Sequence, residues 1–215
     1  MKLAIFFHCV LQGVSRPIDI GFATHLLASQ MDAIQKSGLS DACHEFHIGV
    51  NGDDNDVDTV RLLVPRKAVI TSHGKDATTE IPTMSMLRNW LPEHRDWAVL
   101  YAHMKGVTHP PLDGTWRRGM EHHLFWNWQR AVSDISNGYD ACGCHWLTPE
   151  RWPGLVSSPF FGGNYWHAKA SYLLTLPPLP EPTWDNRYMA ETWIGSGPRR
   201  PRVIDYSPGW PPHSP

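Results

Sequence analysis

The chain has 215 residues, 41% of them hydrophobic and 19% charged, which is typical of one globular domain with a hydrophobic core. Its 19 Lys and Arg and 21 Asp and Glu give a net charge of −2, which argues against bulk attraction to nucleic acid or to an anionic membrane. Since no apolar run approaches the roughly 18 residues that span a bilayer, we expect a cytoplasmic protein, or at most one that is peripheral at the membrane.

The N-terminal half alternates between predicted strands and a predicted helix. Residues 3–10 form a continuous apolar run rich in Phe and Ile, as expected of a central strand buried on both faces. Residues 23–36 carry apolar side chains at helical spacing, and residues 45–50 predict a second strand. An acidic turn is predicted next at residues 52–58, and two further strands are predicted at residues 60–64 and 68–71.

The second half continues this alternation and then becomes rich in proline. A helix over residues 83–91, which stops before Pro92, leads into a strong strand over residues 97–102. A long helix is predicted at residues 116–136 and a strand at residues 140–146. Residues 160–176 predict a short strand or loop that leads into a helix at residues 169–174, and residues 184–193 predict a helix-like segment. Ten of the 39 residues from Pro177 onward are proline, which predicts a largely irregular C-terminal tail.

This order of elements predicts the fold class. Strands that alternate with helices indicate an α/β domain with a mostly parallel central sheet, flanked by helices and joined by right-handed crossovers. Ligands of such sheets bind at the carboxyl ends of the strands. We therefore expect the functional residues where the strand over residues 97–102 ends.

The Cys and His residues do not form a recognisable metal-binding pattern. Cys142 and Cys144 lie in an apolar stretch, where two small buried residues of a strand are a simpler interpretation than a metal or redox pair. The 13 His include the neighbours His122 and His123, but none has the helical spacing of zinc ligands. A zinc hydrolase would need ligands from distant parts of the chain.

His103, Lys105 and Gly106 follow directly after the strand over residues 97–102. This position places them at the edge of the sheet where ligands bind. A Lys there supplies a fixed positive charge to the oxygens of a nucleoside diphosphate, and Gly106 permits close approach of the backbone. A solvated Lys in a turn is an equal alternative.

Arg117 opens the long predicted helix. Exposed backbone amides at a helix N-terminus, with an Arg beside them, attract phosphate. Arg residues at helix starts are more often solvated or paired with a surface carboxylate, so this position alone does not assign a role.

The segment at residues 160–167 (FFGGNYWH) has the composition of a sugar-binding site. Gly163 lets a ring approach, Asn164 can bond hydroxyls, and the rings of Tyr165 and Trp166 can pack against the apolar face of a pyranose. The alternative is a tight bend whose aromatic side chains fill the core.

Glu191 stands among apolar and aromatic residues, including Trp193. Removal from water would raise its pKa and suit it to act as a general base. A structural carboxylate that pairs with Arg187, one turn away on the same helical face, is the alternative.

Taken in order, the segments at residues 103–106, 116–117, 163–166 and 191–195 resemble a family of bacterial and viral glycosyltransferases with a GT-A-type fold, which includes capsule, lipopolysaccharide and rhamnan-synthesis enzymes. The resemblance spans residues 97–197, about half of the chain, and implies a single GT-A-like, Rossmann-like domain. The nucleotide-binding half would be residues 1–106, and the half that binds the sugar and the acceptor would be residues 107–200. The irregular tail would be residues 201–215.

The resemblance also implies a reaction. A sugar would move from a nucleoside diphosphate sugar donor to a hydroxyl of a glycan or glycolipid, as in polysaccharide biosynthesis, and Glu191 would be the catalytic base. The expected ligands of the diphosphate are His103, Lys105, Gly106 and Arg117. The expected contacts of the sugar or the acceptor are Gly163, Asn164, Tyr165, Trp166 and Trp193.

One departure from the family pattern concerns the metal. GT-A enzymes usually end the strand that corresponds to residues 97–102 in Asp-x-Asp, which holds a divalent ion on the donor diphosphate. The matching triplet here is His103-Met104-Lys105. Either Lys105 and Arg117 neutralise the diphosphate directly, or His103 is a lone ligand for Mn²⁺ or Mg²⁺.

Two other functions fit the same composition. A non-catalytic carbohydrate-binding module would use a Trp-rich surface and would need no diphosphate site. A metal-dependent hydrolase would hold stoichiometric metal. Nucleotide binding distinguishes a transferase from the first, and elemental analysis tests the second.

Overall fold

The structure is a computed structural model that describes residues 1–11, 18–75, 77, 79–107, 114–151 and 158–207. The strands of its central sheet are β1 (Leu3–Val10), β2 (Glu45–Asn51), β3 (Val69–Gly74), β4 (Ala98–His103), β5 (Ala141–Gly143), β8 (Trp166–Lys169) and β9 (Val203–Asp205). Their order is β3-β2-β1-β4-β8-β5-β9, and β8 alone runs antiparallel to its neighbours. The strands β6 (Trp146–Leu147) and β7 (Phe160–Phe161) form a separate pair.

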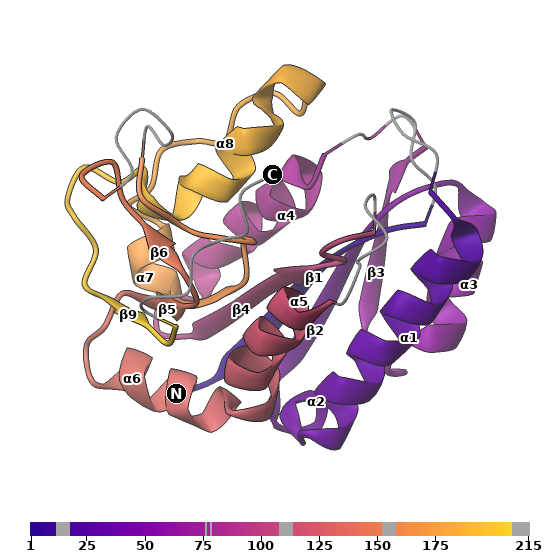
Figure 1. Ribbon diagram of the computed structural model, residues 1–215, viewed down its shortest axis with the longest axis horizontal. Helices are drawn as coiled ribbons and strands as arrows, with labels where there is room; N and C mark the ends of the chain where they lie inside the picture. Colours follow the sequence, from indigo (N-terminus) through magenta and orange to yellow (C-terminus); the bar gives the residue numbers. More distant parts are fainter. Residues whose placement is uncertain (12–17, 76, 78, 108–113, 152–157, 208–215) are drawn as a thin grey trace.

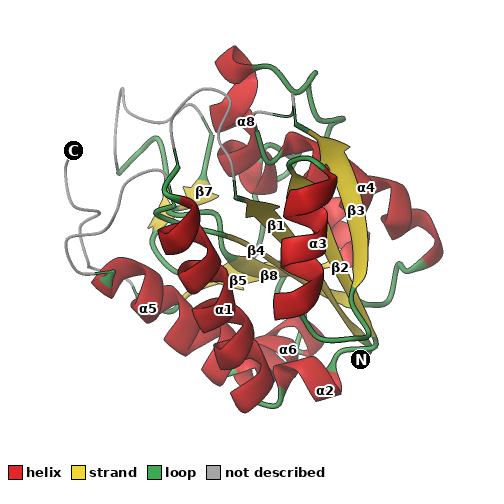
Figure 2. Ribbon diagram, turned by 90° about the vertical axis from the view of Figure 1, so that its right-hand side faces the viewer, coloured by secondary structure: helices red, strands yellow, loops and turns green. Residues whose placement is uncertain are grey.

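Helices cover both faces of this sheet (Figure 1). The α1 face carries α1 (Ile20–Lys36), α2 (Leu39–Ala42), α3 (Asp54–Leu63), α5 (Thr115–Glu121) and α6 (Trp128–Ser136). The α4 face carries α4 (Ile81–Trp90), α7 (Ala170–Leu173) and α8 (Arg187–Thr192). Figure 2 shows α1, α5 and α6 gathered on one side of the strands. A mostly parallel sheet flanked by helices confirms the predicted fold class.

The strand β1 lies at the centre because its sequence is apolar on both faces. Ile5 and Phe7 enter the core under α1, and Ala4 and Phe6 enter the core under α4, all of them 0% exposed. Burying a side chain of this size stabilises the fold by about 1.5–3 kcal/mol. The predicted strand at residues 3–10 is therefore confirmed, and it joins the two cores.

The acidic segment at residues 52–58 begins a helix, where the sequence predicted a turn. Oδ1 of Asp53 accepts hydrogen bonds from the amides of Asn55 and Asp56, at 2.9 and 3.1 Å, and Asp56 accepts one from the amide of Asp53 at 3.0 Å. This reciprocal capping starts α3. The strand predicted at residues 60–64 is therefore wrong, because these residues continue that helix and the turn after it.

Three other segments differ from their predictions. The long helix at residues 116–136 is divided into α5 and α6 by a π-helical turn over His122–Trp126, and the strand at residues 140–146 is divided into β5 and β6. The tail is not wholly irregular, because Val203–Asp205 pairs in parallel with β5. A strand of this length is too short to leave a periodic signal in the sequence.

Cys142 and Cys144 are buried and free, as the sequence predicted. None of the helices in the described ranges is both long enough and apolar enough to cross a membrane.

Candidate functional site

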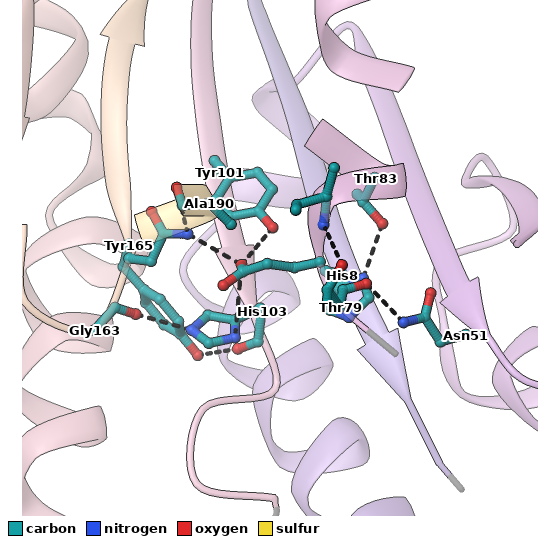
Figure 3. A network of polar contacts seen from close by, with 12 residues as sticks. His8, Asn51, Thr79, Thr83, Tyr101, His103, Gly163, Tyr165 and Ala190 are labelled. Atoms are coloured by element: carbon teal, nitrogen blue, oxygen red, sulfur yellow. Dashed lines mark hydrogen bonds and ion pairs between the residues drawn. The ribbon is translucent and has the colours of Figure 1, made fainter. Parts of the chain in front are cut away.

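Polar side chains from several elements meet at the carboxyl edge of the parallel strands. β8 begins at the edge where β4 ends, because Trp166 lies opposite Tyr101 in the antiparallel register. The segment before β8 therefore returns to the end of β4. Figure 3 shows how side chains from these elements lie together: His8, Asn51, Thr83, Tyr101, His103 and Tyr165.

The carboxylate of Glu80, in the loop between β3 and α4, lies in this group. Its Oε2 accepts hydrogen bonds from the Tyr101 hydroxyl at 2.6 Å and from the Asn164 side-chain amide at 3.1 Å. Nδ1 of His103 lies 3.9 Å from the same oxygen, and the Glu80 side chain is 12% exposed. Burial, and then the charge of Glu80, raise the pKa of Tyr101 well above its usual value, so its hydroxyl stays a donor.

His103 ends β4 and connects two parts of the site. Its Nε2 donates to the carbonyl oxygen of Gly163 at 2.9 Å. Gly163 has a φ of 89°, and a Cβ there would overlap the sulfur of Met120, so this close approach requires glycine. The backbone carbonyl of His103 accepts a hydrogen bond from the Tyr165 hydroxyl.

Lys105 and Gly106 follow His103 at the same edge. The ammonium of Lys105 lies 4.8 Å from the centre of the Trp116 ring, which is a cation–π contact. Among the side chains that the structure describes, Lys105 has no carboxylate partner. Gly106 has a φ of 88°, a conformation that favours glycine. The half-buried Lys105 thus holds a positive charge that the described residues do not neutralise.

Arg117 is paired with a carboxylate, one of the alternatives that its position left open. Its Nη1 donates to Oε1 of Glu121 at 2.7 Å, and the two side chains are 14% and 8% exposed. Nε2 of Gln30 donates to the same oxygen at 3.1 Å. Burial raises the pKa of Glu121, and the charge of Arg117 opposes this shift. This geometry favours a structural role for Arg117 over the predicted contact with a diphosphate.

A further set of hydrogen bonds joins β1, β3 and α4. The hydroxyl of Thr83 lies 2.9 Å from Nδ1 of His8 and 3.0 Å from Nε2 of His73, so it donates to one ring and accepts from the other. Burial, with the charges of His103 and His73, holds the pKa of His8 well below its usual value. His8 is therefore a neutral group that orients the start of α4.

The residues predicted to bind the sugar point into the core. Asn164 uses its Oδ1 to accept a hydrogen bond from Nε1 of Trp166 at 2.9 Å, and the Trp166 ring stacks on Tyr101. The exposed fractions are 0–3% for the side chains in question: Asn164, Tyr165, Trp166 and Trp193. Their rings offer no free face to a sugar, and the tight bend that fills the core is the better interpretation.

Glu191 lies in α8 and is half-buried. The preceding carbonyl, of Ala190, accepts a hydrogen bond from the Asn164 amide at 3.5 Å, and the charge of Glu191 contributes to the raised pKa of Tyr101. The backbone before Glu191 therefore lies near the Asn164 amide that donates to Glu80. Within the described side chains Glu191 makes no hydrogen bond or ion pair, and the side chain of Arg187, its alternative partner, lies outside them.

A divalent metal is not supported by the described donors. No group of three or more His, Cys, Asp and Glu side chains in the described ranges could hold a metal ion. His103 and Glu80 face each other, but the other ring nitrogen of His103 is bound to the Gly163 carbonyl. These residues alone do not fit Mn²⁺ or Mg²⁺, and metal dependence stays a prediction.

Sequence reasoning missed Glu80, Glu121 and Gln30. The partners of Glu80 are 21 and 84 residues away along the chain, so no local pattern identifies it. Glu121 follows Arg117 by four residues, and this spacing was the available signal for their ion pair.

Comparison with solved structures establishes the fold. A structure from Desulfovibrio desulfuricans G20, described as a candidate nucleotide-diphospho-sugar transferase, has a TM-score of 0.50 at 13% identity, over 96% of this chain and 80% of that one. A 4-diphosphocytidyl-2C-methyl-D-erythritol synthase gives 0.43 at 12%, over 95% and 88%. CMP:2-keto-3-deoxy-manno-octonic acid synthetase complexed with CTP gives 0.44 at 10%, over 96% and 90%. The first similarity shows a shared fold.

Comparison at the level of sequence adds a family. The family model described as Domain of unknown function (DUF8361) matches residues 6–182, which begin within β1 and include β2 to β8 but not α8. No curated protein matches this chain.

Proposed function

This chain belongs to the family described as Domain of unknown function (DUF8361), and we propose from the chemistry of its site that it is a glycosyltransferase that uses a nucleoside diphosphate sugar. The sugar would be transferred to a hydroxyl of a glycan or glycolipid. The resemblance to capsule, lipopolysaccharide and rhamnan-synthesis enzymes suggests this class of acceptor.

The observation that carries the proposal is the ammonium of the half-buried Lys105, just after the end of β4. It packs against the Trp116 ring and has no carboxylate partner among the described residues. A positive charge that is partly removed from water favours an anionic ligand, and a diphosphate supplies that charge. The carboxyl edge of an open α/β sheet is also where such ligands bind.

In the proposed reaction, the oxygen of the acceptor hydroxyl attacks the anomeric carbon of the donor sugar. A carbon–oxygen bond forms, the bond from that carbon to the diphosphate oxygen breaks, and its electron pair leaves with the diphosphate. Lys105 stabilises the charge that develops on this leaving group. In an inverting transfer, the hydroxyl proton passes to Glu191.

The carbohydrate-binding alternative depended on a Trp-rich surface. Among the tryptophan side chains that the structure describes, Trp126 is exposed and the others are buried or half-buried. This distribution favours the transferase.

The test is a thermal-shift screen of the full chain with UDP, GDP, CDP, ADP and dTDP, each with and without Mn²⁺, followed by calorimetry. A ligand that binds only the folded state raises the melting temperature by mass action. We expect at least one of these nucleotides to bind without Mn²⁺, because Lys105 can neutralise the diphosphate. If none of the five binds under either condition, the proposal is wrong. Binding only with Mn²⁺ would contradict the metal-free site.

A further inference from the structure

We propose that Glu80 binds hydroxyl groups of the sugar that is transferred, through its carboxylate oxygen Oε1. This inference rests on the function proposed above and names the part of the substrate that Glu80 recognises. Neither the sequence motifs nor the resemblance assigns any role to this residue.

The protein uses only one of the two oxygens of Glu80. The Tyr101 hydroxyl and the Asn164 amide both donate to Oε2, and Nδ1 of His103 faces the same oxygen. Among the described residues, Oε1 has no hydrogen-bond donor. Each carboxylate oxygen can accept about two hydrogen bonds. The side chain is 12% exposed and Oε1 is not one of the fully buried polar atoms that lack a partner, so Oε1 is an acceptor that a ligand can reach.

The orientation of Glu80 is set by these contacts and not by its helix. Glu80 occupies the capping position before α4, yet its side chain does not accept from the first amides of that helix. It extends instead toward β4 and the segment before β8. Because two donors hold Oε2 in place, Oε1 is already oriented before a ligand arrives, which reduces the entropy lost on binding.

Glu80 contacts the end of β4, which leads to Lys105, and through Asn164 it is connected to the helix that carries Glu191. On one side its carboxylate faces His103, two residues before Lys105. On the other side, the Asn164 amide that donates to Glu80 also approaches the carbonyl of Ala190, next to Glu191. The transferred sugar is bonded to the diphosphate and is attacked by the acceptor. In the proposed reaction it therefore lies between Lys105 and Glu191, and the contacts of Glu80 reach the segments that carry both residues.

The charge of Glu80 also selects a sugar over a phosphate. A carboxylate repels the negative oxygens of a diphosphate, whereas sugar hydroxyls are neutral donors. Hydrogen bonds to a charged acceptor are stronger than those between neutral groups. The unshared oxygen therefore fits one hydroxyl, or two neighbouring hydroxyls, of a pyranose.

The structural alternative is that Glu80 only satisfies the buried Tyr101 hydroxyl and Asn164 amide. Glu80→Gln distinguishes the two roles, because a Gln carbonyl can still accept from both donors while its amide replaces the free acceptor with a donor. Glu93→Gln is the matched control: it makes the same change in charge in the exposed turn that follows the other end of α4.

The experiment measures the affinities of the wild type and both variants by calorimetry, with UDP, GDP and dTDP and with the hexose conjugate of each. We expect Glu80→Gln to bind the preferred conjugate about tenfold more weakly, with unchanged affinity for the free nucleotide and an unchanged melting temperature. Glu93→Gln should behave as the wild type. Glu80→Asp, which keeps the charge but withdraws the oxygen, should show the same selective loss, and it decides the question if the Gln variant does not fold.

Each other outcome has a definite meaning. Unchanged affinity of Glu80→Gln for the conjugate overturns the inference. An equal loss for nucleotide and conjugate also overturns it, because Glu80 would then contact the nucleotide. If the wild type binds no nucleotide and no conjugate, the proposed function fails, and this inference fails with it. The first two results leave wild-type nucleotide binding, and hence the proposed function, intact.

Discussion

Two polar networks meet at His103 from opposite faces of the sheet, and they differ in how they hold charge. The Glu121 network, on the α1 face, consists of Gln30, Arg117, Glu121 and Tyr165. The Glu80 network, on the α4 face, consists of Glu80, Tyr101, Asn164 and the His103 ring. In the first, a carboxylate and a guanidinium neutralise each other at 2.7 Å. In the second, the carboxylate is held mainly by neutral donors and keeps one oxygen unshared. The first is suited to support the fold and the second to bind a ligand.

The backbone and the ring of His103 belong to different networks. Its carbonyl oxygen accepts hydrogen bonds from the Tyr165 hydroxyl and from Nε2 of Gln30, whereas its ring faces Glu80 and the Gly163 carbonyl. The closed network therefore positions the strand end that carries the open one. Substitutions in the first should reduce stability, and substitutions near the second should reduce binding or turnover.

The largest expected effect is on stability, from Glu121→Ala. Removing this carboxylate leaves the mostly buried Arg117 without its partner, which costs about 3–5 kcal/mol of the free energy of unfolding. Urea denaturation measures this loss. Asp32→Ala, which breaks an exposed pair with Lys36, is the control and should cost at most about 1 kcal/mol. Equal effects of the two substitutions would contradict the assignment of the Glu121 network to the fold.

The next largest effect is on turnover, from Glu191→Gln. This change keeps the volume of the side chain but removes its ability to accept a proton, so the transfer rate should fall at least about a hundredfold. Nucleotide affinity and melting temperature should stay near normal. The exposed Glu181→Gln serves as the control. A near-normal rate would show that Glu191 is not the base, and early melting would indicate a structural carboxylate.

A smaller effect is expected on affinity, from Lys105→Ala. Loss of one charge-assisted contact should weaken nucleoside diphosphate binding by about tenfold or more. Calorimetry on the folded variant measures it, and Lys36→Ala, at the C-terminal end of α1, controls for the loss of one positive charge. If Lys105→Ala binds the nucleotide as the wild type does, the diphosphate role of Lys105 is wrong.

The smallest expected effect, counted for each pH unit, is a loss in the free energy of unfolding in acid. Burial lowers the pKa of His167, which donates to the Leu124 carbonyl, to about 4, whereas the unfolded value is about 6.5. Between these values the unfolded chain binds more protons, so stability is full above about pH 6.5 and falls by up to about 1.4 kcal/mol per unit toward pH 4. The lowered pKa of His8 acts in the same direction.

The melting temperature of the wild type and of His167→Gln, measured from pH 7 to pH 4.5, checks this expectation. The variant should be less stable at neutral pH because it loses packing, but its melting temperature should fall less steeply with acid. An equally steep fall in both proteins would show that His167 does not titrate in this range.

The sequence predicted the parts of the fold that repeat along the chain. The apolar run of β1, the helical spacing in α1 and the strong strand before His103 depend on neighbours in sequence, and all three are confirmed. The same reasoning failed at α3, where the reciprocal capping of Asp53 and Asp56 turned an acidic stretch into a helix start. Capping depends on a few specific hydrogen bonds, which average composition does not reveal.

The position of the candidate site could be predicted from the sequence, but most contacts between its residues could not. The end of β4 follows from the fold class, so Lys105 and His103 could be placed at the edge. Tyr165 and Trp166 were assigned to a sugar because aromatic residues suit both a ligand and a core, and only the packing of β8 against Tyr101 separates the two. Glu80 could not be found, since its partners, Tyr101 in β4 and Asn164 before β8, are distant along the chain.

Gly49, in β2, acts as a spacer between the sheet and the helix that follows Glu80. A Cβ at this position would overlap both the Thr83 hydroxyl and the ring of His73. Any larger residue would therefore push α4 outward at its first turn, and Glu80, three residues before Thr83, would move with it. Because Gly49 has no side chain, α4 can pack close to the sheet, and this keeps the Glu80 carboxylate within reach of Tyr101. Gly49 thus influences the proposed sugar contact from a distance.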